Sequence, residues 1–283
     1  MDSQKSYENN FSFELFPPKT DKGMENLKNT VSALNAKGPK FFSCTYGAGG
    51  STQERTFSTV DWLRSEGIDT APHLSCIGSD KAEIIEILER YKAEGVKRIV
   101  ALRGDLPSGA GAGGLGELRY ANELVELIKS EYGDHFYIEV AAYPEMHPQA
   151  DNFNSDIDNF MRKVEAGADS AITQYFYNVD SYLHFVDVCE TKGLSIPVVP
   201  GIMPITNFSN LSRFSDACGA ELPRWLRKQM EAYGDDIDSI KALGHETVLR
   251  LCQQLLEAGA PGLHFYTMNQ SAASLALWED LGL

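Results

Sequence analysis

The chain has 283 residues, 43% of them hydrophobic, and a formal net charge of −15 at pH 7. This acidic balance argues against a nucleic-acid partner, because phosphate binding needs a basic face, and no run of eighteen apolar residues is present to span a membrane. The first ten residues are polar and lack the apolar segment of a signal peptide, so we expect a cytoplasmic protein, with a length that suits one domain.

Strand-like and helix-like segments alternate from residue 11 onward. The first strand is expected at 11–16, where aromatic and other residues alternate until Pro17 and Pro18 end it. Leu27, Val31 and Leu34 follow at helical spacing. The remaining strands are expected at 40–46, 69–75, 98–102, 136–143, 170–177, 197–202 and 263–266. Helices are expected at 56–66, 80–95, 118–130, 157–167, 182–189 and 207–256, the second of these opened by a capping-box pattern.

Eight strands that alternate with helices predict a parallel sheet, and eight such units that close on themselves predict a (β/α)8 TIM barrel. We place this single barrel domain at residues 11–283 and treat residues 1–10 as a flexible N-terminal tail. An open, doubly wound sheet is the alternative that the same periodicity allows.

Glu14 is the sharpest candidate for catalysis, because active sites of such barrels lie at the C-terminal ends of the strands. It stands between Phe13 and Leu15, just before the first strand ends. If its side chain points inward, desolvation would raise its pKa and suit it to general acid chemistry. The alternative is an outward glutamate paired with a helix residue.

Arg103 and Asp105 follow a strand of apolar residues, where packing gives little reason for charge. They form either part of a site or a local ion pair that caps the loop. The glycines of 109–114 match the GxGxxG pattern, but the strand before them ends at Leu102 and Pro107 intervenes. A flexible loop at the barrel mouth is therefore favoured over a dinucleotide-binding turn.

A ladder of polar residues marks the helix expected at 157–167 and the residues just before it. Asp156, Asn159, Arg162 and Lys163 lie at i, i+3, i+6 and i+7. Such a ladder can bind ribose hydroxyls and pyrophosphate, although a solvated helix face has the same pattern. The five cysteines show no CxxC spacing and the histidines no metal-ligand spacing, so we expect reduced thiols and no metal site.

Eight ordered motifs run from about residue 11 to the C-terminus: FELFPP at 13–18, TYGA at 45–48, PHL at 72–74, LRGDLP at 102–107, AYPEMHP at 142–148, AITQ at 171–174, PGIMP at 200–204 and HFYTMN at 264–269. Together they resemble the bacterial type of methylenetetrahydrofolate reductase. The resemblance implies a barrel with non-covalent FAD that uses NADH or NADPH to reduce 5,10-methylenetetrahydrofolate to 5-methyltetrahydrofolate. It also implies a ping-pong cycle, a place in one-carbon metabolism and methionine synthesis, and a homo-oligomer (dimer or tetramer).

The resemblance gives roles to individual residues. Glu14 matches the acid that protonates folate N10, and Asp105 matches an aspartate between flavin and pterin whose negative charge stabilises the resulting cation. Gln174 and Phe214 match substrate contacts, as does Thr45. Positions that match FAD contacts are Thr45, Tyr46, Ala48, His73, Arg103, Gly104, Asp105, Tyr143, His147, Asp156, Asn159, Arg162 and Lys163.

Two departures concern the folate end of the site. Asn210 stands where some relatives carry Gln, and Gln270 where some carry Arg, so the mode of folate binding is the part least supported by the resemblance. We expect the catalytic barrel alone, without the adenosylmethionine-responsive domain of some family members. A non-redox barrel lyase and a binding protein that uses the same barrel mouth are the competing functions.

Overall fold

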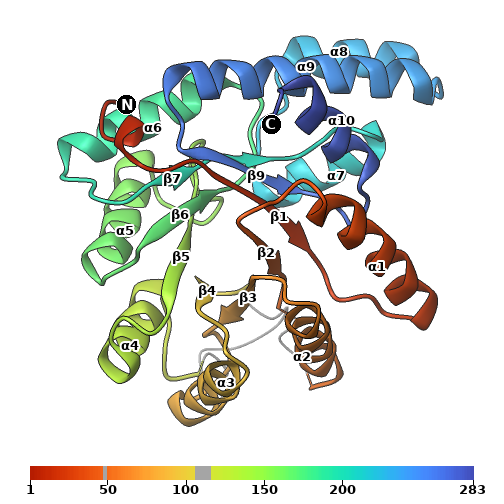
Figure 1. The fold of residues 1–283 in the computed structure, drawn as a ribbon. Coiled ribbons are helices and arrows are strands. Elements are labelled where there is room, and N and C mark those ends of the chain that lie inside the picture. Colours follow the sequence, from red (N-terminus) through yellow and green to blue (C-terminus); the bar gives the residue numbers. More distant parts are fainter. Residues whose placement is uncertain (47–49, 106–115) are drawn as a thin grey trace.

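The computed structural model describes residues 1–46, 50–105 and 116–283, with the backbone alone for 50–52. Parallel strands form one sheet in the order β7-β6-β5-β4-β3-β2-β1-β9-β8. Their bounds are β1 (Asn10–Leu15), β2 (Phe41–Cys44), β3 (Thr70–Ser75), β4 (Arg98–Leu102), β5 (Tyr137–Ala142), β6 (Ser170–Thr173), β7 (Val198–Val199), β8 (Gly201–Ile202) and β9 (Gly262–Tyr266). Because β7 and β8 are separated only by Pro200, the two ends of the sheet meet and the predicted TIM barrel is confirmed (Figure 1).

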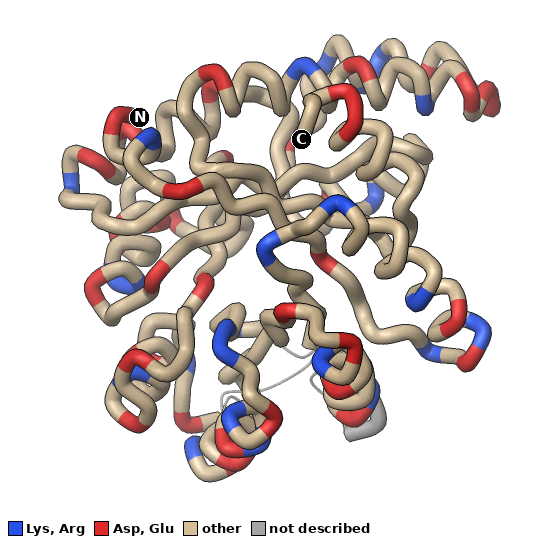
Figure 2. Tube along the Cα trace, viewed as in Figure 1, with Lys and Arg blue, Asp and Glu red and all other residues tan. Residues whose placement is uncertain are grey.

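The helices surround this barrel and carry most of the charged side chains, as Figures 1 and 2 show. They are the 3-10 helix η1 (Gln4–Ser6) and the α-helices α1 (Asp21–Asn35), α2 (Gly50–Ser65), α3 (Lys81–Ala93), α4 (Ala121–Tyr132), α5 (Phe153–Glu165), α6 (Val179–Thr191), α7 (Phe208–Cys218), α8 (Arg224–Tyr233), α9 (Ile237–Ala258) and α10 (Ala272–Asp280). Within the described ranges, none of the helices combines the length and the apolar composition needed to cross a membrane.

The strand expected at 197–202 is divided into β7 and β8. Pro200 has no N–H to donate to a neighbouring strand, although its carbonyl still accepts from the His264 N–H at 2.9 Å. The Gly201 N–H donates to Thr173 Oγ1 at 2.9 Å. A Cβ at Gly201 would lie 2.1 Å from the Thr173 carbonyl oxygen, so the backbones approach too closely here for any side chain.

The helices expected over 207–256 are α7, α8 and α9, and Gly219 and Gly234 end the first two in backbone conformations with positive φ. One further expectation needs correction. The strand predicted over 170–177 ends at Thr173, where the chain leaves the sheet toward the barrel mouth.

The N-terminal segment, expected as a flexible tail, packs against the barrel. The Met1 ammonium lies 2.8 Å from both Asp187 and Glu190. The Gln4 side chain is fully buried, donates to the Ile196 carbonyl and accepts from the Val198 N–H. Its amide thus satisfies backbone groups at the start of the short strand β7, which gives this segment a reason to be held in place.

Strand alternation divides the sheet into two faces. Phe13, Phe42 and Leu263 belong to the large core between the sheet and the helices, so the residues next to them point into the barrel. The inner face holds a small apolar cluster of Phe41, Ala71, Val100 and Ile172. It also carries buried polar side chains, namely Ser12, Ser43, His73, Glu139, Ser170 and His264.

Candidate active site

Glu14 lies on the inner face of β1, near the end of the strand that opens to the barrel mouth. Its side chain is 21% exposed, and its Oε2 lies 3.5 Å from His73 Nε2 and 3.9 Å from His264 Nε2. The Thr267 hydroxyl donates to the Glu14 carbonyl at 2.6 Å and so fixes the backbone behind the carboxylate. The inward orientation expected of Glu14 is therefore present, and the outward alternative is not.

His73 faces Glu14 from β3. Burial lowers the pKa of His73, against the opposing effect of the Glu14 charge, so the imidazole is neutral at physiological pH. Its Nε2 is buried and finds no hydrogen-bond partner among the described residues. A buried ring nitrogen directed at a partly exposed carboxylate indicates a surface built to meet a ligand.

His264 faces Glu14 from β9 and is completely buried. Its Nδ1 lies 2.7 Å from Ser12 Oγ, and its Nε2 lies 3.4 Å from Ser43 Oγ. The ring lies against Phe41 and Tyr266, with centroid distances of 6.1 and 5.4 Å. Ser12 is not among the predicted site residues, but its position two residues before Glu14 places it on the same face of β1.

A second cluster joins β4, the loop after β5 and the start of α5. The Arg103 guanidinium donates to Gln149 Oε1 at 2.6 Å, and the Gln149 N–H donates to His147 Nδ1 at 3.0 Å. The His147 N–H donates to Asp156 Oδ2 at 2.8 Å, and the Tyr143 ring meets the His147 ring edge-on at 4.5 Å. The structure thus brings together Arg103, Tyr143, His147 and Asp156, four of the residues predicted to contact the cofactor. Gln149, which links Arg103 to His147, was not predicted.

Burial changes the pKa values of this second cluster. It raises the pKa of Tyr143 to about 12, an effect to which the Asp105 charge adds, and it lowers the pKa of His147. Asp105 itself is exposed at the end of the described part of its loop. The Arg103 guanidinium bonds to Gln149 and to the Gly104 carbonyl, so it is the cluster, rather than a local ion pair, that holds this arginine.

The polar ladder of α5 divides between two faces. Asp156 and the partly buried Lys163 face the barrel, where the Lys163 ammonium donates to the Ala141 carbonyl. Burial lowers the pKa of Lys163 to about 8. Asn159 and Arg162 are exposed and hydrogen-bonded to each other at 2.7 Å. The four residues therefore do not form a single binding face.

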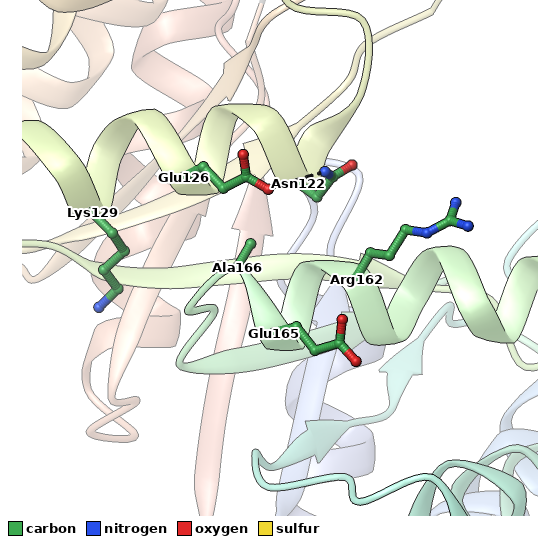
Figure 3. A pocket seen from close by; sticks show the side chains of 6 residues that line it. All are labelled: Asn122, Glu126, Lys129, Arg162, Glu165 and Ala166. Carbon is green, nitrogen blue, oxygen red and sulfur yellow. Dashed lines mark hydrogen bonds between the residues drawn. The ribbon is translucent and has the colours of Figure 1, made fainter.

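Arg162 belongs to a surface groove between α4 and α5, with a volume of about 480 Å³ (Figure 3). Figure 3 shows the side chains that line it, which are Asn122, Glu126, Lys129, Arg162, Glu165 and Ala166. Because two acids and two bases share this groove, it has no strong preference for an anion or a cation.

The remaining predicted residues lie around the mouth of the barrel. Gln174 follows β6, with its N–H bonded to the Ala142 carbonyl at 2.8 Å. Asn210 and the partly exposed Phe214 lie on α7, and Gln270 is exposed after β9. Thr45 and Tyr46 follow β2, and the Tyr46 hydroxyl accepts from Gln53 at 2.8 Å. Ala48 and the glycines of 109–114 lie outside the described residues.

Gly104, in the loop after β4, is closely packed. Its φ is 88°, and a Cβ there would lie 2.8 Å from Ile77 and 2.9 Å from Ser75. In the described part of the chain, no group of three or more His, Cys, Asp or Glu side chains could hold a metal ion. All five cysteines are free thiols.

This chain is similar to known proteins over nearly its whole length. A family model described as methylenetetrahydrofolate reductase matches residues 1–282. The 5,10-methylenetetrahydrofolate reductase of Escherichia coli (strain K12) is 40% identical over 275 residues, which cover 97% of this chain and 91% of that protein. The enzyme of the same name from Buchnera aphidicola subsp. Acyrthosiphon pisum is 42% identical over 273 residues, 96% of this chain and 91% of its own length.

A probable methylenetetrahydrofolate reductase (NADH) of Oryza sativa subsp. japonica is 37% identical over 288 residues, 96% of this chain but 48% of the plant protein. Among solved structures, a protein from Clostridium thermocellum that binds two copies of 5-methyl-5,6,7,8-tetrahydrofolic acid has a TM-score of 0.71 at 17% identity, covering 99% of this chain and 97% of that one. At that identity the structural likeness supports the fold alone.

Proposed function

The chain belongs to the methylenetetrahydrofolate reductase family, and on that premise we propose that its barrel mouth reduces 5,10-methylenetetrahydrofolate to 5-methyltetrahydrofolate with non-covalent FAD and a reduced nicotinamide. The observation that carries the proposal is the inward Glu14 carboxylate, partly exposed at the mouth and flanked by two buried imidazoles. A carboxyl group in this setting can deliver a proton to a substrate that closes the mouth.

The residues at the mouth have the chemistry that a flavin needs. Arg103 supplies a cation, and the hydrogen bond from Gln149 to His147 Nδ1 leaves the proton of that ring on Nε2 as a donor. Gly104 lets the loop that carries Arg103 and Asp105 pack directly against Ile77 and Ser75, because any side chain there would collide with both. When bound, FAD would carry hydride from the nicotinamide to the folate. Arg103, His147, Tyr143 and His73 are the residues that we propose hold it.

Two carboxylates have separate roles in the proposed reaction. Glu14 gives a proton to folate N10, the N10–methylene bond breaks with its electron pair going to N10, and the methylene carbon becomes an iminium cation at N5. Asp105 is exposed in the loop that follows β4, and we propose that its negative charge stabilises that cation. Hydride addition to the methylene carbon then completes the methyl group.

Gln174 and Phe214 border the same opening, from the end of β6 and from α7. We propose that they contact the nicotinamide and the pterin in turn, because one mouth serves both substrates in a ping-pong cycle. Asn210 and Gln270 are exposed, and we propose that they meet the distal part of the folate. Both are neutral, so they offer hydrogen bonds but no charge to a folate carboxylate.

Two half-reactions test the proposal. Purified protein should be yellow or gain flavin on reconstitution with FAD, and NADH or NADPH should bleach it anaerobically. Glu14→Gln should still be bleached, while its oxidation by 5,10-methylenetetrahydrofolate slows by about 10²- to 10⁴-fold, as expected for loss of a general acid. Glu25→Gln, an exposed change on α1, is the control and should leave both rates unchanged.

Two results would overturn parts of this scheme. If the purified protein takes up no FAD, the proposed cofactor is wrong, and the proposed redox function is wrong with it. Equal loss of both half-reactions in Glu14→Gln would assign Glu14 to flavin binding or folding instead of proton transfer. Titration with each nicotinamide in turn, read at the flavin absorbance, determines the preferred hydride donor.

A further inference from the structure

Gln149, in the loop after β5, contacts two of the residues that we propose hold FAD. Its side-chain Oε1 accepts from the Arg103 guanidinium at 2.6 Å, and its backbone N–H donates to His147 Nδ1 at 3.0 Å. Gln149 is itself exposed, so burial does not force its side chain into this contact. The two hydrogen bonds indicate instead that Gln149 helps to arrange Arg103 and His147 for a ligand.

The backbone around Gln149 is held in place. The Ala150 N–H donates to the His147 carbonyl at 2.9 Å and closes a turn. Pro148 occupies the second position of this turn, where its fixed φ is favourable. Pro148 also lies against the end of α7, because a Cβ at Gly219 would come within 2.8 Å of Pro148 Cγ. The side chain of Gln149 therefore starts from a fixed point.

The described hydrogen-bond partners of the Arg103 guanidinium are neutral. They are Gln149 and the Gly104 carbonyl, the latter at 3.2 Å. Arginine has donors only, so Gln149 must present its oxygen to it. Other arginines of the described chain pair with carboxylates, namely Arg64, Arg90, Arg98, Arg227 and Arg250. In a chain with 40 acidic and 25 basic residues, a neutral partner leaves the positive charge of Arg103 uncompensated.

We infer that Gln149 is a positioning residue for Arg103: it fixes the guanidinium through a neutral oxygen and leaves its positive charge free for an anionic group of FAD. The inference rests on the proposed function. The carboxylates of the cluster are engaged elsewhere, because Asp156 accepts the His147 N–H and Asp105 is exposed. Two groups of FAD can meet the charge. They are the pyrophosphate, which is anionic in every redox state, and the N1–C2 edge of the flavin ring, which gains negative charge on reduction.

Gln149→Glu and Gln149→Met separate this role from that of a simple tether. Glutamate would hold the guanidinium more strongly than an amide does, but it would cancel the charge. Methionine has a similar length and leaves the charge, but it removes the acceptor. We therefore expect the affinity for FAD to fall by about ten- to hundredfold in Gln149→Glu and by only about two- to fivefold in Gln149→Met. A tether without an electrostatic role predicts the reverse order.

The experiment titrates the flavin-free full chain with FAD and follows the flavin fluorescence at low and at high salt. The deficit of Gln149→Glu should shrink in about 1 M salt, where ions screen charges more than about 3 Å apart. Gln149→Met should have no further effect when Arg103 is also Met. Gln229→Glu, an exposed change on α8, adds the same charge and is the matched control, so it should bind FAD as the wild type does.

Riboflavin, which has no phosphate, distinguishes the two anionic groups. If Arg103 meets the pyrophosphate, Gln149→Glu should bind riboflavin as the wild type does, and the midpoint potential of its bound FAD should not change. If Arg103 meets the flavin ring, riboflavin binding should weaken as well. The midpoint potential should then fall by about 30 mV for each tenfold change in the ratio of the affinities for reduced and oxidised flavin.

Three results would overturn the inference: Gln149→Glu binds FAD at least as tightly as Gln149→Met, its deficit is the same at low and high salt, or Gln229→Glu shows an equal deficit. Urea unfolding of the flavin-free variants should give the same midpoints as the wild type, which separates a binding defect from a folding defect. Wild-type protein that binds no FAD would instead overturn the proposed function.

Discussion

The ion pair of Arg98 and Glu139 inside the barrel gives the sharpest stability prediction. Glu139 is completely buried, and the Arg98 guanidinium donates to its Oε1. Glu139 Oε2 has no partner among the described residues. Arg98 also lies over the rings of Phe41 and Tyr137, at 4.6 and 4.0 Å from their centroids. The carboxylate therefore depends on one cation for its charge compensation.

Arg98→Met keeps most of the apolar stem but leaves a buried carboxylate unpaired. Removal of one partner of a buried pair typically costs about 3–5 kcal/mol, a large part of the 5–15 kcal/mol that is typical for a folded protein. Loss of the two ring contacts adds about 1 kcal/mol or more. The double variant Arg98→Met, Glu139→Leu removes both charges and should recover most of the loss, because no charge then stays buried.

Urea unfolding followed by circular dichroism measures these free energies. The slope of the transition should stay constant across the variants, so that midpoints compare stabilities directly. Glu139→Gln is the intermediate case, since it removes the charge but keeps an acceptor for Arg98. If the double variant were as unstable as Arg98→Met alone, the ring contacts of Arg98 would dominate and the charge argument would be refuted.

Three further predictions follow from close contacts and pKa values. Gly201→Ala should lower stability by roughly 3 kcal/mol, since its Cβ would lie 2.1 Å from the Thr173 carbonyl; a thermal unfolding shift equivalent to under about 1 kcal/mol would contradict this. The pKa of Lys163 is about 8 in the folded protein against an ordinary 10.5, so between these values the folded state binds fewer protons than the unfolded state. As the pH rises through this window, the free energy of unfolding of the wild type should therefore increase by up to about 3 kcal/mol relative to that of Lys163→Met. A stability difference that does not change with pH would show that the ammonium is hydrated. Iodoacetamide at pH 8 should alkylate the partly exposed Cys218 at least about tenfold faster than the buried Cys44, because burial raises the pKa of the Cys44 thiol. Peptide mapping measures the two rates, and equal labelling would show that the barrel wall opens.

Much of the fold could be predicted because local signals and tertiary structure agree. Asp80 and Glu83 form the expected capping box at the start of α3. The strand β4 has the predicted bounds, because a run of apolar residues is typical of a barrel strand that is buried on both faces. The failures occur where backbone geometry decides. Nothing in the hydrophobic pattern reveals that Pro200 divides a strand or that Gly201 must pass so close to its neighbour.

The helix ladder of α5 shows the same limit at the site. Successive residues of a helix are turned by about 100°, so Lys163 comes back to within about 20° of Asp156, whereas Arg162 is turned by about 120° from it. The structure places the first two toward the barrel and Arg162 in the outer groove. Spacing in the sequence groups these residues into one ladder, whereas their angles around the helix axis separate Asp156 and Lys163 from Arg162.

Side-chain parity explains why Glu14 could be predicted and its partners could not. Position and motif point to Glu14, whereas Ser12 and His264 meet only through a contact between strands that are far apart in sequence. Once the register pairs Ser12 with His264 and Glu14 with Ser43, all four point into the barrel at adjoining levels. A polar residue at each inward position is unfavourable for a barrel interior taken alone. Hydrogen bonding offsets part of this cost, because Ser12 Oγ lies 2.7 Å from His264 Nδ1 and Ser43 Oγ lies 3.4 Å from His264 Nε2.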